Sequence, residues 1–210
     1  MRIRIYYQKS KELKFTSVLD VQTIWQRSVR RAGLPLEYSQ GFHPRPRMQV
    51  PFPLPLGFTA KNEIIDLWLV GEFNVTEVEE KLSYALPVGI KIQAIEKLND
   101  QKKSDALSAV YADYAVKIFG KVDDADRMRQ SIDQLLASST VIRERNGKIY
   151  DLRPLILSLE FLGIKNNTCH LKMRLNAHPS MVGRPDEVME ELGVDISDCE
   201  FERLDVCFNV

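Results

Sequence analysis

Two kinds of segment alternate along this chain, short ones with apolar side chains at every second residue and longer ones with helical apolar spacing, and their order occurs twice. In the first half, extended segments are expected at residues 2–7, near 48–50, at 63–70 and at 90–95. Helical segments are expected from Thr16 or Ser17 to Ala32 and from Asn74 or Thr76 to Leu86. Gly33 and Pro87 stop these helices. The order β-α-β-β-α-β is typical of the split βαβ of ferredoxin-like domains.

The second half repeats this order with one addition. Extended segments are expected at residues 110–119, 155–164, 168–177 and 200–208, and helices at 123–137 and 185–192. Asn146-Gly147 separates residues 141–145 from 148–152 and is a strong signal for a β-hairpin. The sequence therefore predicts an α+β fold of tandem ferredoxin-like domains, the second with an inserted β-hairpin.

A polar, lysine-rich stretch divides the two halves. Asn99 to Ser104 has the composition of a linker. We expect one domain at residues 1–98, with a basic helix and a proline-rich loop. The other is expected at residues 105–210, with the hairpin insertion and an acidic C-terminal helix.

Charge is distributed unevenly although the formal net charge is zero. Residues 1–49 hold ten Lys or Arg and three Asp or Glu, for +7, and the rest of the chain carries −7. A basic end of this kind attracts polyanions, and an acidic end attracts basic partners. An uneven but merely solvated surface is the open alternative.

Composition excludes several classes of protein. No apolar run approaches the roughly 20 residues of a membrane helix, and the N-terminus lacks the pattern of a signal peptide, so we expect a cytoplasmic protein without a membrane partner. The three cysteines form no CxxC pair, which argues against a disulfide scaffold or a zinc finger.

The unusual region runs from Ala32 to Gly57 and contains six of the ten prolines. Proline fixes its own φ and restricts the residue before it, so this loop is expected to be stiff without being helical. Together with the preceding helix it supplies guanidinium and aromatic groups, a combination suited to phosphates and stacked bases. The residues predicted to bind nucleic acid are Arg27, Arg30, Arg31, Tyr38, Phe42, His43, Arg45 and Arg47. In the alternative, the loop packs over the sheet, with Phe52, Leu54 and Phe58 in the core and the arginines solvated.

Motifs for cofactors and metals are missing from the sequence. It contains no GxxxxGK[ST], GxGxxG, GxSxG, HExxH or CxxxCxxC, so no cofactor is predicted. Cys169-His170 has no second pair at metal-ligand spacing, and no metal site is predicted. If the chain has a catalytic residue, His43 is the candidate.

Several segments together resemble one known family. They are Phe15–Asp20, Arg30–Leu36, Tyr38–Phe42, Pro55–Gly57, Asp151–Ile156 and Arg184-Pro185. In these segments the chain resembles a radical-SAM-linked bacterial domain of unknown function. The resemblance implies a separate B12-binding-type radical SAM protein as partner, because members occur fused to such a protein or encoded beside one. Val18 and Arg45 stand where the family commonly has histidine, so no role that requires histidine there is carried over.

These observations lead to three hypotheses about function. The leading hypothesis is an RNA-binding accessory module that presents structured RNA, ribosomal or transfer RNA, to a separate radical SAM enzyme and is not itself catalytic. The second is a metal-independent ribonuclease that uses His43 as general base. The third is a protein-docking subunit without RNA affinity, which binds a basic partner through its acidic C-terminal region.

Overall fold

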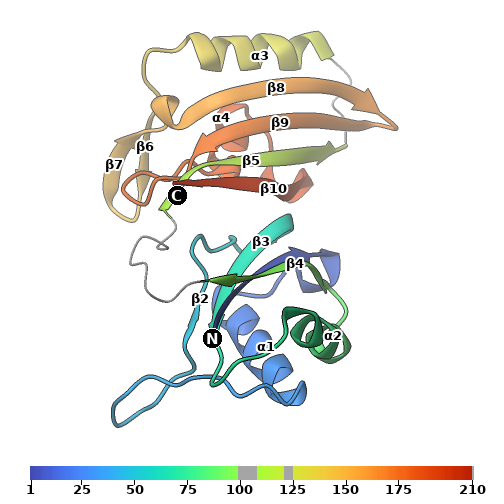
Figure 1. The fold of residues 1–210 in the computed structure, drawn as a ribbon. Helices are drawn as coiled ribbons and strands as arrows, with labels where there is room; N and C mark the ends of the chain where they lie inside the picture. The colour runs from blue at the N-terminus through green and yellow to red at the C-terminus, as the bar shows by residue number, and fades with distance from the viewer. Residues whose placement is uncertain (99–107, 121–124, 210) are drawn as a thin grey trace. The chain divides into compact units, whose positions relative to one another are not determined.

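The computed structural model describes residues 1–98, 108–120 and 125–209, and the chain divides into two compact units, Met1–Ser108 and Ala109–Asn209. Figure 1 shows the elements of each unit. The expected linker, Asn99 to Ser104, lies outside the described residues.

The first unit is an antiparallel sheet with two helices. Its elements are β1 (Arg2–Lys9), a short 3-10 helix (Lys11–Leu13), α1 (Val18–Arg31), β2 (Met48–Gln49), β3 (Phe58–Trp68), α2 (Val75–Ala85) and β4 (Ile90–Leu98). β1 lies between β4 and β3 and is antiparallel to both, and β2 pairs antiparallel with β3. The predicted order of strands and helices is confirmed in this unit, with β2 reduced to two residues.

Local sequence explains where α1 begins and ends. The Ser17 hydroxyl accepts a hydrogen bond from the Asp20 amide, while the Asp20 carboxylate accepts one from the Ser17 amide, which forms a capping box. At the other end Gly33 has φ +68°, the left-handed conformation that ends many helices. Ser17, and not Thr16, is therefore the N-cap.

β3 begins at Phe58, five residues before the expected start at Glu63. Phe58 and Ala60 are buried, so the two-residue alternation extends back to Phe58. Polar side chains at the intervening positions hide this part of the strand in the sequence.

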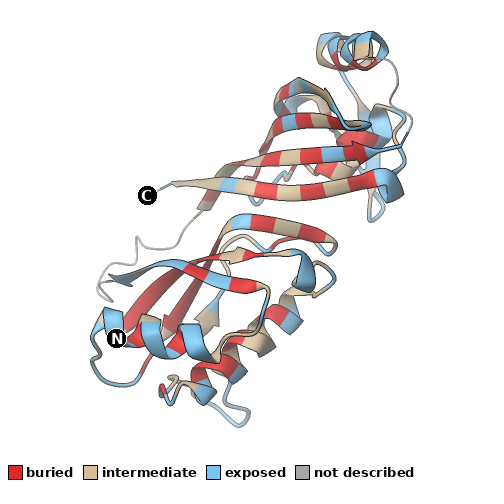
Figure 2. Ribbon diagram, turned by 90° about the vertical axis from the view of Figure 1, so that its right-hand side faces the viewer, coloured by how far each residue is buried: buried red, intermediate tan, exposed pale blue. Residues whose placement is uncertain are grey.

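The core of the first unit lies between the sheet and its two helices. Ile3, Ile5 and Tyr7 alternate along β1 and are buried against α1 and α2, whose core side chains include Trp25 and Leu82. The rings of Tyr7 and Trp25 meet edge to face, with centroids 5.1 Å apart. Figure 2 shows the buried residues along these strands and helices.

The second unit repeats the arrangement and adds a hairpin. Its elements are β5 (Ser108–Phe119), α3 (Ala125–Ala137), β6 (Ile142–Arg145), β7 (Lys148–Asp151), a 3-10 helix (Arg153–Leu155), β8 (Ile156–Lys165), β9 (Thr168–Asn176), α4 (Pro185–Glu191), a 3-10 helix (Ile196–Asp198) and β10 (Cys199–Asn209). The strand order is β10-β5-β9-β8, and β6 and β7 form a separate two-stranded sheet. The expected start of α3 at Asp123 lies outside the described residues.

The inserted hairpin is confirmed, and its turn follows from the two residues that predicted it. Asn146 has φ 53° and Gly147 has φ 75°, the pair of positive values required by a type I′ turn. The strands on either side pair in register from Ile142↔Asp151 to Arg145↔Lys148.

The α+β class is likewise confirmed. Apolar residues on the helix-facing side of β5 and β9, such as Tyr114 and Met173, form the core of this unit.

Candidate nucleic-acid interface

The proline-rich segment folds back on itself into a finger, defined here as residues 37–47, which projects from the first unit (Figure 1). At its base Glu37 donates its amide to the Trp68 carbonyl at 2.8 Å, and the Arg47 amide donates to Glu37 at 2.7 Å. Further out, the Ser39 amide donates to the Arg45 carbonyl at 2.8 Å, and Tyr38 pairs with Pro46 in an isolated antiparallel β-bridge. The finger is therefore anchored to β3 and held by cross-links along its length, without helix, as the sequence predicts.

The end of α1 and the base of the finger enclose an open hollow of about 340 Å³, called here the Tyr38 hollow. Its lining consists of Arg30, Gly33, Leu34, Pro35, Leu36 and Tyr38. The structure thus brings together two of the predicted residues, Arg30 from the helix and Tyr38 from the finger.

The three arginines of α1 are used differently. Arg31 donates to the Ala85 carbonyl at the end of α2 at 2.6 Å and to the Ser28 hydroxyl at 3.1 Å. Cations are favoured beside the carbonyls at a helix C-terminus, so Arg31 ties α1 to α2. Arg27 and Arg30 are exposed, and within the described residues their side chains have no hydrogen-bond or ion-pair partner.

The two arginines of the finger also differ. Arg47 pairs with Glu37 at 2.6 Å and lies 4.9 Å from the centre of the Trp68 ring, so it reinforces the base of the finger. The Arg45 side chain is exposed and, in the part of the chain that the structure describes, makes no such contact. Of the five predicted arginines, Arg27, Arg30 and Arg45 are therefore the ones whose side chains have no partner among the described residues.

Phe42 and His43 lie at the tip of the finger. Both are exposed, and Phe42 is fully so. The His43 ring contacts no acid or base among residues 1–98, 108–120 and 125–209, so the geometry gives it no partner for proton transfer.

The predicted packing of the loop's apolar residues also occurs. Leu54 and Phe58 are 6% and 4% exposed, and Phe52 is half-buried. Each of the two interpretations therefore describes one part of this region. Residues 37–47 project, as expected of a binding loop, whereas apolar residues beyond Val50 pack against the sheet.

Three of the ten cationic residues counted near the N-terminus are not on the surface. Arg2, Arg4 and Lys9 are 8%, 7% and 2% exposed. Arg2 and Arg4 donate to the buried Asp66 carboxylate at 2.7 to 2.9 Å, and the Lys9 ammonium donates to the Thr16 and Phe58 carbonyls. The charge count therefore overstates the basic surface, and the alternation of β1 was the signal that these cations lie within a sheet.

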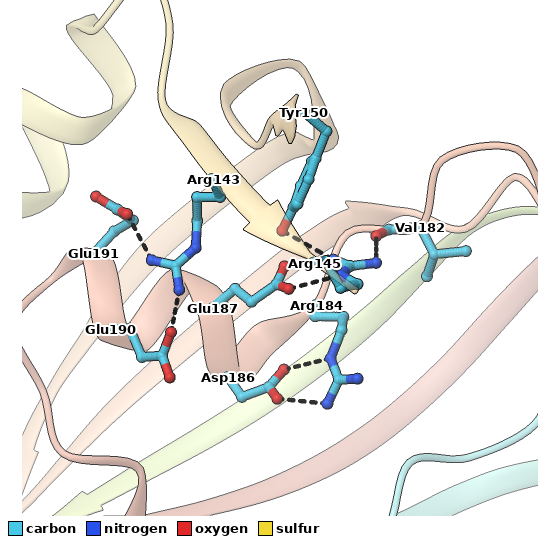
Figure 3. A network of polar contacts seen from close by, with 9 residues as sticks. All are labelled: Arg143, Arg145, Tyr150, Val182, Arg184, Asp186, Glu187, Glu190 and Glu191. Carbon is cyan, nitrogen blue, oxygen red and sulfur yellow. Dashed lines mark hydrogen bonds and ion pairs between the residues drawn. The ribbon is translucent and has the colours of Figure 1, made fainter. Parts of the chain in front are cut away.

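An ion-pair network in the second unit was not foreseen from the sequence (Figure 3). Arg143 and Arg145 on β6 reach α4, where Arg143 pairs with Glu190 and Glu191, and Arg145 pairs with Glu187. Arg184, which precedes α4, pairs with Asp186. All four acids of this helix are thus engaged within the chain, so α4 contributes less free negative charge to the acidic C-terminal region than its composition indicates. The alternation of β6 does place Arg143 and Arg145 on one face, but nothing in the sequence pairs that face with α4.

The described residues contain neither a metal-binding cluster nor a membrane-spanning helix. Among the described residues no group of three or more His, Cys, Asp or Glu is placed to hold a metal ion. Within the same residues no helix combines the length and apolar character that a membrane crossing requires.

The fold resembles part of a chain in each of two solved complexes. One is described as "Crystal Structure of a Cbf5-Nop10-Gar1 Complex", with TM-score 0.54, 10% identity, and coverage of 97% of this chain and 48% of the other. The second is described as "Structure of H/ACA RNP bound to a substrate RNA containing 2'-deoxyuridine", with TM-score 0.50, 11% identity, and coverage of 97% and 47%. The present chain spans about half the length of those chains, and at such low identity the likeness defines the fold alone.

The sequence itself places the chain in a family. Residues 2–185 match the model of the family described as "Uncharacterized protein conserved in bacteria" (DUF2344), and the chain belongs to that family. No curated protein matches the chain.

Proposed function

We propose that this protein is an RNA-binding accessory module that presents structured RNA to a separate enzyme and does not itself catalyse a reaction. The observation that carries the proposal is a set of exposed arginines without partners among the described residues, Arg27 and Arg30 on α1 and Arg45 on the finger, of which Arg30 lines the Tyr38 hollow. Guanidinium groups that are not neutralised internally bind phosphate, and exposed aromatic rings stack on unpaired bases. Ribosomal or transfer RNA is the proposed class of ligand.

The structural neighbours support an RNA-related role in a limited way. One of the two descriptions names an RNA–protein particle with a substrate RNA bound. Fold alone does not determine function, so this support is secondary to the arrangement of arginines.

The salt dependence of RNA binding tests the proposal. Transfer RNA and a ribosomal RNA fragment are titrated against the protein over a range of salt concentrations. Each phosphate contact contributes about 0.7 to 0.9 to the slope of log K against log salt. We expect Arg27→Ala, Arg30→Ala and Arg45→Ala combined to reduce that slope by about 2 to 3.

The matched control changes the same amount of charge elsewhere. Lys117, Lys148 and Lys165 are exposed in the second unit, and within the described residues they have no ion-pair partner. Their combined replacement by alanine should leave the slope nearly unchanged. Absence of RNA affinity at low salt, or equal losses in the two triple variants, would contradict the proposal.

The enzyme that receives the RNA is proposed to be a B12-binding-type radical SAM protein. The segments quoted above, including Arg30–Leu36 and Tyr38–Phe42, support this through their resemblance to radical-SAM-linked domains. Co-expression of the tagged chain with such a protein, followed by affinity capture, should recover both chains and associated RNA. Recovery of the tagged chain alone would refute the pairing.

We also propose that the chain is two ferredoxin-like domains, at residues 1–98 and 105–210, related by tandem duplication. The repeated element order and the two matching strand orders, with the fourth main strand beside the first, support this. Separate expression of the two ranges should give two folded proteins with cooperative thermal transitions, and an unfolded product from either would argue against independent domains.

A further inference from the structure

The lining of the Tyr38 hollow combines apolar, cationic and aromatic side chains. Leu34, Pro35 and Leu36 are the apolar residues, Arg30 is the cation, and Tyr38 supplies the ring. Among the described residues, no carboxylate belongs to this lining. Its chemistry therefore suits a flat apolar ring that carries an anionic group.

The backbone leaves the hollow open at the end of α1. A Cβ atom at Gly33 would meet nothing within 4 Å, and Gly33 adopts φ +68°. A ligand can approach the main chain closely there, because glycine has no side chain to block it.

The backbone that carries Tyr38 and Pro35 is held in place before any ligand binds. The residues that flank Tyr38 are fixed by the bonds from the Glu37 amide to Trp68 and from the Ser39 amide to Arg45, each 2.8 Å long. The backbone at Pro35 is fixed by the bond from the Val70 amide to the Pro35 carbonyl at 2.9 Å. Such preorganisation lowers the entropy lost on binding.

We propose that this hollow receives one unpaired nucleotide of a bound RNA, with its base stacked on Tyr38 and its phosphate on Arg30. The inference rests on the proposed RNA-binding function and adds a single-base site to it. A volume of about 340 Å³ lies at the lower end of the range for small-ligand sites, which suits one nucleotide and not a stacked pair. A base within a duplex does not expose its face to a side chain, so the site selects unpaired positions.

The experiment compares two unstructured RNA decamers, one with bases and one built of abasic ribose phosphates. Wild-type protein is expected to bind the base-bearing decamer about 5- to 150-fold more tightly, the range that stacking of one base provides. Tyr38→Ala should remove that preference, while Tyr38→Phe should keep it because the ring remains. Arg30→Ala should weaken binding of both decamers by a similar factor.

Tyr84 provides the matched control. It is an almost fully exposed tyrosine on α2, outside the hollow. Tyr84→Ala should leave the preference for bases intact. The variants are checked by circular dichroism so that a loss of folding is recognised.

The outcomes separate the two proposals. If neither decamer binds at low salt and structured RNA does not bind either, the proposed function is wrong and this site with it. If RNA binds but the wild-type protein shows no preference for bases, or Tyr38→Ala keeps it, RNA binding stands and the single-base site is refuted. A free nucleoside monophosphate that binds as tightly as the decamer would show that the hollow serves a free nucleotide, which also refutes the inference.

Discussion

Replacing Arg145 by methionine should destabilise the protein far more than the same change at Arg143. Arg145 donates to the Glu187 carboxylate, to the Val182 carbonyl at 3.0 Å and to the Tyr150 hydroxyl at 3.1 Å (Figure 3). The Glu187 side chain is only 12% exposed, so loss of the guanidinium leaves a mostly buried carboxylate without this partner. Fully buried pairs lose about 3–5 kcal/mol when one partner is removed, and for this partly exposed arginine we expect about 2–4 kcal/mol.

Arg143→Met is the matched comparison on the same strand. Its partners Glu190 and Glu191 are 44% and 30% exposed, and exposed ion pairs contribute about 1 kcal/mol or less. Water can replace the lost guanidinium at these carboxylates. The difference between the two variants thus tests whether burial, and not the count of ion pairs, sets the contribution.

Urea unfolding monitored by circular dichroism gives the free energy of unfolding of each variant. A double-mutant cycle with Glu187→Gln measures the coupling between Arg145 and Glu187, which we expect to exceed about 1 kcal/mol. Equal losses for Arg145→Met and Arg143→Met, or a coupling near zero, would refute this reasoning about the buried carboxylate.

Two further predictions concern the helix cap and the thiols. Ser17→Ala should lower the free energy of unfolding by about 1 kcal/mol, because the N-cap bond to the first turn of α1 is lost. Thr23→Ala, on the exposed side of the helix, should change it little in the same urea titration. Burial raises the pKa of Cys199 to about 12, so at pH 8 only about one thiol in ten thousand is thiolate, the reactive form. The half-exposed Cys207 should therefore react first with Ellman's reagent, and reaction at Cys199 should increase as pH rises. Rapid modification of Cys199 at pH 8 would contradict the burial argument.

Elements with a local cause could be predicted from the sequence. The Asn146-Gly147 turn and the N-cap of α1 each satisfy a backbone requirement within a few residues, so the sequence predicted the turn and limited the cap to Thr16 or Ser17. The start of β3 at Phe58 could not be placed, because polar side chains hide the alternation between Phe58 and Glu63, although Ala60 still pairs with Lys9 of β1. The short β2 was expected only approximately, near Met48, since two residues give no periodicity.

The candidate site was predictable as a region but not as a set of contacts. Arg30 and Arg31 are neighbours in sequence, yet one faces the Tyr38 hollow and the other binds the end of α2. Arg45 and Arg47 diverge in the same way, since only Arg47 meets an acid and an aromatic ring at the base of the finger. Which cation is neutralised depends on groups distant in the chain, and spacing alone does not contain that information.

Ion pairing determines which charges of the uneven sequence remain available to a ligand. In the second unit the acids of α4 meet Arg143, Arg145 and Arg184, so the acidic composition there contributes to structure. In the first unit the buried arginines of β1 are paired with Asp66, while Arg27, Arg30 and Arg45 have no partner in the described part of the chain. Solvated guanidiniums contribute little to folding and keep their full capacity to bind an anion, because no carboxylate must be displaced. Under the proposed function, Arg27, Arg30 and Arg45 are therefore the groups expected to bind a polyanion, and Arg30 lines the same hollow as Tyr38.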